Sequence, residues 1–561
     1  MRGGTAIGAG WRYNIVMKPH ALHFPSPQAA GNRPLDRWDI LAALLVGVGS
    51  LGAYVRTLAP GILYGDSAEF QTLAATLGVA HPSGYALYLL LAKVFTWLPL
   101  QNLAWRVNLL SAVMGALALV GMYWMIRLLM GSRSGAILGV VIVGISRTFW
   151  SQTVIAEVYT LAALTVLAAL LLLFAWHNDP PRRLRWLFLA AFLIGLSLHI
   201  TVVVMAPAMA LFVCWTLVAS HQPARQWWRT LGVGLAGALA GAAVFLLATL
   251  ALVWHNPPTS YVQVTLIPSH SAWALDAADL DTPIEQLTAT VLGAQWQQSL
   301  FSGNIAFMLA ELKHTLKWLL NYDLAIWALP LALLGWVVIL LRRRAWGIFL
   351  ALYGATLLFL IVNYMGPGKY VFLMSTYLLI GIAAGVGVGW LVSFGQAALS
   401  AQPPWLFRTV QALGIALLAW ALLSPFWAER WQALQAGAAT FVTDDEDTYP
   451  IHDLLEPRTL AEGRLEQVEA DAILLMDWKT LYPTYFIAQV ENRRPGVRIL
   501  ENIPGEHEGT LAESLVQEIT QALQRGQPVY SDRPYPKLEA IFSFTARAGI
   551  DLLRVELVVA P

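Results

Sequence analysis

The chain is patterned as a series of long apolar runs joined by short polar connections. Eleven runs approach the roughly 20 residues that a helix needs to cross a bilayer. They lie at about 38–58, 106–130, 134–150, 157–176, 185–200, 201–219, 230–254, 323–341, 345–364, 370–395 and 408–427. The pattern predicts an α-helical polytopic membrane protein with about eleven spans. Residues 1–37 lack the apolar region of a signal peptide and are expected to form a cytoplasmic tail.

A further apolar stretch, 83–99, is predicted to lie at the membrane surface or to re-enter it. It is short, contains Lys93, and is bracketed by Pro82 and Pro99. If it does not cross, the inside loops contain eleven basic residues and one acid, Asp179. If it crosses, most of these arginines move outside, against the positive-inside rule. We therefore expect a cytoplasmic N-terminus and two long outer loops, 59–105 and 255–322.

Charge is distributed unevenly and divides the chain into two parts. Residues 1–429 carry 36 charged side chains, whereas residues 430–561 carry 33, about the share of an ordinary soluble protein. This predicts a membrane domain at 38–429 and an extracytoplasmic α/β domain at 430–561. In the latter we expect strands at 472–476, 497–500, 528–530 and 551–559, with helices at 478–491 and 510–525. The net charge of +1 argues against a nucleic-acid partner.

Ionisable residues near the outer ends of the predicted spans are the candidates for function, because such groups are costly in a membrane. They are Arg56, Asp66, Glu69, His81, Lys93, Arg106, Arg147, Glu157, His199 and Lys369. All of them fall on the same predicted side of the membrane. We therefore expect one polar site that opens outward and is lined from several helices.

Each candidate has a structural alternative. Asp66 and Glu69 have the spacing of a helix capping box, or Asp66 is a general base. His81 either belongs to a surface turn or binds a phosphate or an acceptor hydroxyl.

Arg147 and Glu157 either form an ion pair, or Glu157 joins Asp66 in holding a divalent cation. His199 is structural or contacts substrate, and Lys369 either snorkels or contacts a lipid phosphate. Asp477, at the end of the first soluble strand, is more simply a helix cap than a ligand contact.

Five segments resemble one family: GDSAEF, LGVAHPSGYALY, WRVNLLSAVMGA, RTFWSQTVIAEVYTL and GLSLHIT. They resemble the transmembrane protein 260 family of protein O-mannosyltransferase-like enzymes, in the GT-C superfamily of membrane glycosyltransferases. The stretch DAILLMDWKTLYPTYFIAQVENRRPGVRIL resembles the tail of bacterial members. The resemblance extends over about residues 38–500.

The resemblance implies an inverting glycosyltransferase of the inner (plasma) membrane, with a sugar on a polyprenyl phosphate as donor and a protein or glycolipid as acceptor. It implies Asp66 as catalytic base, Glu157 as a second acid for a metal such as magnesium or manganese or for substrate, and 83–99 as a juxtamembrane helix. The other candidates for substrate binding are Glu69, His81, Arg147, Tyr159, His199 and Lys369. The segment Gly366-Pro367-Gly368-Lys369-Tyr370 departs from the family, which is expected to have an acid before the tyrosine. The residues identify neither the sugar, mannose in the family's name, nor the acceptor.

Two other functions fit a membrane protein of this composition. A transporter or flippase predicts inverted repeats and charges deep within spans, whereas no internal repeat is found and the charges lie at the outer ends. A non-catalytic scaffold would use the C-terminal domain to bind a partner.

Overall fold

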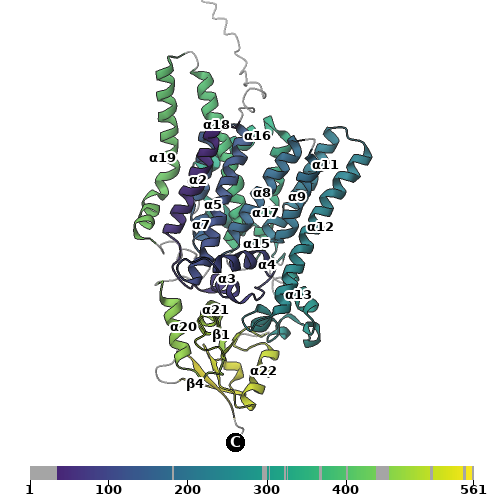
Figure 1. The fold of residues 1–561 in the computed structure, drawn as a ribbon, viewed down its shortest axis with the longest axis vertical. Coiled ribbons are helices and arrows are strands. Elements are labelled where there is room, and N and C mark those ends of the chain that lie inside the picture. Colours follow the sequence, from purple (N-terminus) through teal and green to yellow (C-terminus); the bar gives the residue numbers. More distant parts are fainter. Residues whose placement is uncertain are drawn as a thin grey trace, which may run out of the picture.

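The structure, a computed structural model, describes residues 35–179, 182–293, 300–301, 303–320, 324, 326–365, 369–399, 402–437, 454–505, 509–546 and 551–558. The predicted cytoplasmic tail thus lies almost wholly outside the described residues. Figure 1 shows three tiers, with a bundle of long helices at one end, a thin layer of short helices below it, and an α/β domain at the other end.

Among the described residues, eight helical segments are long and apolar enough to cross a membrane, and each coincides with a predicted span. They are Arg37–Arg56 (α2), Leu103–Met130 (α5), Tyr159–Asn178 (α8), Ile200–Ala219, Ala224–His255 (α12), Arg344–Val362 (α17), Lys369–Ala398 and Arg408–Ala436. The segment Ile200–Ala219 consists of two helices, Ile200–Val203 (α10) and Ala206–Ala219 (α11). The last two segments contain Met374–Ala398 (α18) and most of Pro404–Ala436 (α19), respectively. The polytopic helical fold is thereby confirmed.

The other three predicted spans also fall on helices, but on shorter or broken ones. Arg133–Gly144 (α6) and Arg147–Thr153 (α7) are bent by 73° and count as a ninth span only if taken together. Arg183–Ser197 (α9) and Ala328–Arg342 (α16) have 15 residues each. A helix of that length measures about 22 Å, less than the roughly 30 Å hydrocarbon core. The apolar windows of the sequence extend across helix ends and so overstate helix length.

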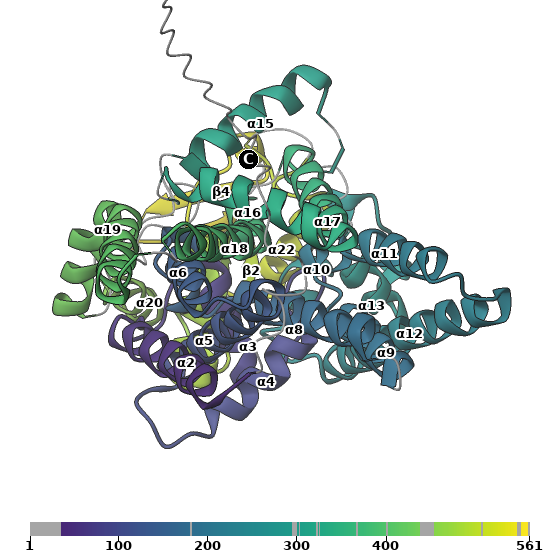
Figure 2. The same ribbon diagram turned by 90° about the horizontal axis from the view of Figure 1, so that it is seen from above.

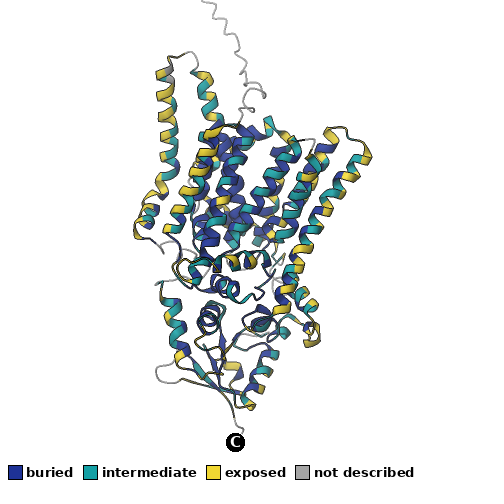
Figure 3. Ribbon diagram, in the orientation of Figure 1, coloured by how far each residue is buried: buried dark blue, intermediate teal, exposed yellow. Residues whose placement is uncertain are grey.

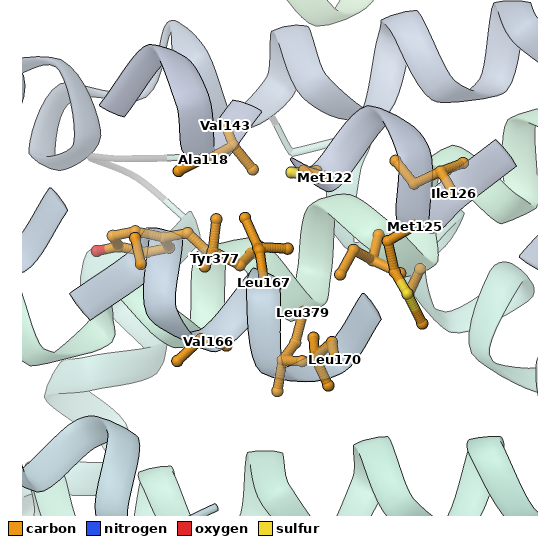
Figure 4. Close-up of a cluster of buried hydrophobic side chains, with 14 of the residues drawn as sticks. Ala118, Met122, Met125, Ile126, Val143, Val166, Leu167, Leu170, Tyr377 and Leu379 are labelled. Carbon is orange, nitrogen blue, oxygen red and sulfur yellow. The ribbon is translucent and has the colours of Figure 1, made fainter. Parts of the chain in front are cut away.

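Glycines let several bundle helices approach closely. A Cβ on Gly241 of α12 would lie 2.1 Å from the carbonyl oxygen of Phe192 in α9, and one on Gly195 of α9 would lie 2.1 Å from that of Ala238. Small residues at such crossings are how membrane helices gain packing contact. Figure 4 shows the bundle core, where Met122, Val143 and Leu167 from α5, α6 and α8 converge.

The outer faces of the bundle are apolar and exposed. Figure 3 shows exposed positions along α12 and α19, among them Leu247 of α12 at 66% and Trp420 of α19 at 68% exposure. Figure 2, viewed from above, shows these two helices on opposite flanks of the bundle. An apolar surface of this extent suits lipid rather than water.

The middle tier is built from Gly65–Thr76 (α3), Ala86–Thr96 (α4), Pro283–Leu292 (α13) and Ile305–Trp318 (α15). Three short helical turns lie in the chain between α12 and α13, at Val262–Leu266 (η2), His270–Trp273 (η3) and Ala277–Leu280 (η4). The predicted surface helix at 83–99 corresponds to α4, whose 11 residues are too few to cross a bilayer.

The C-terminal domain contains the helices Glu456–Glu466 (α20), Trp478–Tyr485 (α21), Phe486–Val490 (η7) and Glu513–Gln524 (α22), and the single turn Pro536–Leu538 (η8). Its strands are Ile473–Met476 (β1), Arg498–Glu501 (β2), Val529–Ser531 (β3), Phe542–Ala546 (β4) and Leu553–Leu557 (β5). The sheet order is β2-β1-β3-β5-β4, with β2, β1 and β3 parallel and the last two pairings antiparallel. Four strands and two helices were predicted; β4 and α20 were not.

The two faces of this sheet belong to different cores, because successive side chains on a strand point to opposite faces. Ile473 and Leu475 of β1 pack with α22 in one cluster. Leu474 and Met476 belong to another cluster, which continues through α21 into α3 and α4 of the middle tier. The C-terminal domain and the membrane domain are therefore joined through a shared apolar core.

Candidate active site

Asp66 and Glu69 both lie on the first turns of α3 but in different surroundings. The helix begins at Gly65, whose φ of +54° favours glycine, and its N-cap is Tyr64 without a side-chain capping bond. The capping-box interpretation is therefore wrong. The Asp66 side chain is 39% exposed, whereas that of Glu69 is fully buried.

Glu69 is buried because it binds His81 in the loop that follows α3. Its Oε1 accepts a 2.8 Å hydrogen bond from the backbone N–H of His81, and its Oε2 lies 2.5 Å from Nδ1 of the same residue. The other ring nitrogen, Nε2, lies 3.9 Å from Oδ2 of Asp66. The result is a chain of three groups, in which the buried carboxylate of Glu69 orients the imidazole of His81 toward the partly exposed carboxylate of Asp66.

The charge state of this chain follows from its surroundings. Burial by itself disfavours the imidazolium of His81, but the nearby carboxylates of Glu69 and Asp66 outweigh it and raise the His81 pKa to about 9. Burial also raises the pKa of Glu69 above its ordinary value. His81 therefore carries a positive charge at neutral pH and faces Asp66 with it.

Glu157 completes a group of three acids around His81. It lies in the break between α7 and α8, where its backbone N–H and carbonyl both bond to the hydroxyl of Ser111, at 3.1 and 3.0 Å. Ser67 of α3 donates a 3.4 Å hydrogen bond to its side chain. Burial, followed by the charge of Asp66, raises the pKa of Glu157 well above its ordinary value.

Tyr159 and His199 form an aromatic wall next to this group. The His199 ring lies edge-on to Tyr159, with centroids 5.5 Å apart, and 6.1 Å from the ring of Tyr85. Tyr85 in turn lies 5.0 Å from the His81 ring. His199 also caps α10, since its Nδ1 accepts from the backbone N–H of Thr201 at 3.3 Å. The structure thus brings Asp66, Glu69, His81, Glu157, Tyr159 and His199 together.

The predicted cations are committed to other partners. Arg147 pairs with Glu429 of α19 at 3.0 Å, and Lys369 pairs with Glu311 of α15. The remaining three bond to backbone carbonyls: Arg56 to Gln435, Lys93 to Ala75, and Arg106 to Thr96 and Leu98. One of the two interpretations of Arg147 paired it with Glu157, whereas the structure shows its ion pair with Glu429. These five cations therefore stabilise the helices and loops that surround the site.

Trp478 is a site residue that sequence reasoning missed. It is the first residue of α21, and its indole Nε1 donates a 2.6 Å hydrogen bond to Oδ1 of Asp66. The residue before it, Asp477, caps the same helix by accepting from the backbone N–H of Thr480 at 3.0 Å. The capping interpretation of Asp477 is thus confirmed. For Trp478, the only sequence signal was its position after a strand.

A second missed pair fixes the loop that leads into α3. The side-chain amide of Gln71 donates to Asn108 at 2.8 Å and to the carbonyl of Gly61 at 3.2 Å, and Asn108 donates to the carbonyl of Ala59 at 2.9 Å. Both amides are fully buried. They hold α3 against α5 and so position its first turn.

The gathered acids do not make a metal centre by themselves. Within the described ranges, no group of three or more His, Cys, Asp or Glu side chains is arranged to hold a metal ion. Glu69 and His81 are bound to each other, and the raised pKa of Glu157 disfavours the ionised carboxylate that a hard cation needs. The residues present therefore fit a divalent cation poorly.

Comparisons with known proteins point to one family. The profile of the protein O-mannosyl-transferase TMEM260 N-terminal domain matches residues 66–222. The mouse protein O-mannosyl-transferase TMEM260 is 36% identical over 173 residues, which are 30% of this chain and 25% of that protein. The corresponding Dictyostelium discoideum protein is 26% identical over 147 residues, 26% of this chain and 18% of that protein. The match thus spans a quarter or less of these relatives.

Among solved structures, the oligosaccharyltransferase of Archaeoglobus fulgidus has a similar fold. It aligns with a TM-score of 0.50 at 12% identity, over 90% of this chain and 72% of that one. The likeness extends over both the bundle and the C-terminal domain. Residues 66–222 therefore resemble the N-terminal domain of the TMEM260 proteins, within a chain whose fold is similar to that of this oligosaccharyltransferase.

Proposed function

We propose that this protein is a membrane glycosyltransferase that moves a sugar from a polyprenyl-phosphate donor to an acceptor hydroxyl, with Asp66 as general base. The observation that carries the proposal is the position of Asp66. It is the accessible carboxylate of an otherwise buried acid–histidine cluster, with 39% of its side chain exposed. Helix α3, which bears Asp66 and Glu69, lies in the tier between the apolar bundle and the C-terminal domain (Figure 1), which suits a substrate that is half lipid and half sugar.

The chemistry needs one base and one leaving group. The acceptor oxygen attacks the anomeric carbon while its proton passes to Asp66. The bond from that carbon to the phosphate oxygen breaks, and its electron pair leaves with the lipid phosphate. Attack on the face opposite the phosphate inverts the anomeric configuration.

The electrostatics of the cluster support an anionic donor. His81 is positively charged at neutral pH because its pKa is raised to about 9. Burial raises the pKa of Glu157 well above its ordinary value, which disfavours a second negative charge there. An imidazolium beside the reacting centre stabilises the charge that develops on the departing phosphate. Tyr159 and His199 are candidates for packing against the sugar. Arg147 and Lys369 act indirectly, by holding the helices around the site through their ion pairs.

The relatives support mannose as the sugar and a protein as the acceptor, since two of them are named protein O-mannosyl-transferases. The proposed setting is the inner membrane, with the site on its outer side, as the distribution of arginines predicts. No step of the mechanism requires magnesium or manganese. Treatment with a chelator in the assay below tests this. If the chelator abolishes transfer and added magnesium or manganese restores it, the reaction requires a cation.

The test is transfer of label in proteoliposomes. The purified chain is reconstituted with polyprenyl-phosphate mannose carrying a radiolabelled sugar and supplied with an acceptor extract from its own cells. Wild type is expected to label the acceptor. Asp66→Asn keeps the size of the side chain but removes the base, and is expected to lower the rate at least about 100-fold.

Asp281→Asn is the matched control, because Asp281 is an exposed aspartate outside the cluster. It is expected to transfer at the wild-type rate. Failure of wild type to label any acceptor with several polyprenyl-phosphate sugars would falsify the proposed activity. Normal transfer by a folded Asp66→Asn protein would instead remove only the role of Asp66.

A further inference from the structure

The bond between Trp478 and Asp66 joins two residues that are 412 positions apart in the chain. Its donor comes from the C-terminal domain and its acceptor from the membrane domain, at 2.6 Å. A charge-assisted bond of this length is among the stronger kinds of hydrogen bond in proteins. It lies on the side chain that the proposed mechanism uses as base.

Trp478 is itself held firmly. It begins α21 directly after β1, and Asp477 before it is fixed through its backbone N–H by Asp532 at 2.8 Å. Its ring lies edge-on to Tyr482 and to His81, with centroids 5.2 and 5.8 Å apart. The indole N–H therefore approaches Asp66 from a rigid element rather than from a loop.

The two domains are also fastened to each other around this bond. Thr72 of α3 donates to the carbonyl of Tyr482 at 3.2 Å, and Thr265 of η2 donates to Glu501 of β2 at 2.6 Å. Farther out, the hydroxyls of Ser271 and Ser514 lie 3.0 Å apart. These contacts fix α21 relative to α3, so the donor and the acceptor have a set separation.

The two oxygens of Asp66 have different surroundings. Oδ1 accepts from Trp478, while Oδ2 faces Nε2 of His81 at 3.9 Å, beyond hydrogen-bond distance. Within the described ranges, the Asp66 side chain has no hydrogen bond other than the one from Trp478. The indole bond selects one rotamer and leaves Oδ2 available for the acceptor proton.

We infer that Trp478 is a positioning residue for the catalytic base, so that the C-terminal domain supplies part of the catalytic centre. The inference rests on the proposed function of Asp66. A base that is misplaced by about 1 Å loses on the order of 100-fold in rate, so the effect appears in kcat. The indole N–H does not contribute to substrate affinity in this arrangement, so that affinity changes little.

The test compares variants that keep or remove the N–H donor, in the proteoliposome assay. Trp478→Phe retains a ring against His81 and Tyr482 but has no donor, and is expected to lower kcat about 10- to 100-fold with KM within about twofold. Trp478→His restores a ring N–H and is expected to exceed Trp478→Phe in kcat by at least about fivefold. Tyr482→Phe is the control, because the buried Tyr482 hydroxyl has no hydrogen-bond partner in the part of the chain that the structure describes. It is expected to match wild type.

Each remaining outcome has a distinct meaning. If Trp478→Phe keeps the kcat of wild type, or raises only KM, the positioning role is overturned while the proposed function stands. Both replacements are smaller than tryptophan, so equal kcat values for Phe and His also overturn it, even if both proteins are destabilised. Absence of transfer by wild type is instead a failure of the proposed function.

Discussion

At the scale of single residues, one buried pair sets the charge of the site. The side chain of Glu69 has no exposed surface, and both of its oxygens contact His81. One accepts from the backbone N–H and the other lies against the ring. Burying a carboxylate without a partner is costly. The pair therefore links the local fold of the loop after α3 to the positive charge that faces Asp66.

This pair predicts a dependence of stability on pH. The His81 pKa is raised from 6.5 to about 9, so folding is stabilised by protonation below about pH 6.5 and loses that contribution as pH rises through about 9. We expect the thermal unfolding midpoint of wild type in detergent to fall between pH 7 and 10 by roughly 2 °C more than that of His81→Gln. His221→Gln, which alters an exposed loop histidine, should follow wild type. Parallel pH curves for wild type and His81→Gln would contradict the assigned charge.

The residue types of the site could be predicted from the sequence, but their partners only in part. Asp66, Glu69, His81 and Glu157 carry a local signal, since charges at membrane depth are rare. Trp478 carries only the weak signal of its position after a strand, because its role depends on a contact across 412 residues. The pairing of Arg147 with Glu429 was missed for the same reason: nothing in either segment specifies the other.

At the scale of elements, the bundle depends on glycines at helix crossings. Gly241→Leu places a Cβ 2.1 Å from the backbone oxygen of Phe192, so α9 and α12 must separate. We expect a loss of about 1–3 kcal/mol, seen as a lower unfolding midpoint and a smaller monodisperse fraction on size exclusion in detergent. Gly232→Leu on the same helix is the control, because a Cβ there meets nothing within 4 Å. Equal midpoints for the two variants would show that α9 moves aside freely.

Elements were predictable where one physical signal dominated. Apolar length located the bundle helices, and the proline-bracketed α4 was recognisable as too short to cross. The strand β4 was missed because it is an edge strand whose residues are mostly partly exposed. The helix α20 was missed because its many charged residues mask the apolar period, and it is fastened instead by ion pairs such as that of Arg458 with Glu491.

At the scale of the whole molecule, orientation in the membrane is the main prediction. Figure 1 shows the α11–α12 turn and the C-terminal domain at opposite ends of the molecule. In a Cys214→Ser background, which removes the one native cysteine, Asp281→Cys is expected to react with an impermeant maleimide in right-side-out vesicles. His221→Cys is expected to react at least about tenfold more slowly until the vesicles are opened. The reverse pattern would invert the topology.

The span of 412 residues between Asp66 and Trp478 has a consequence for how the protein is made. Chains are synthesised at about 5–20 residues per second, so Trp478 follows Asp66 from the ribosome by roughly 20 to 80 s. During that interval the membrane helices are synthesised while Asp66 still lacks its indole partner. The bond between Asp66 and Trp478 therefore forms late in biogenesis, after the membrane helices have been synthesised. A chain truncated before α21 retains the membrane helices but never acquires that partner.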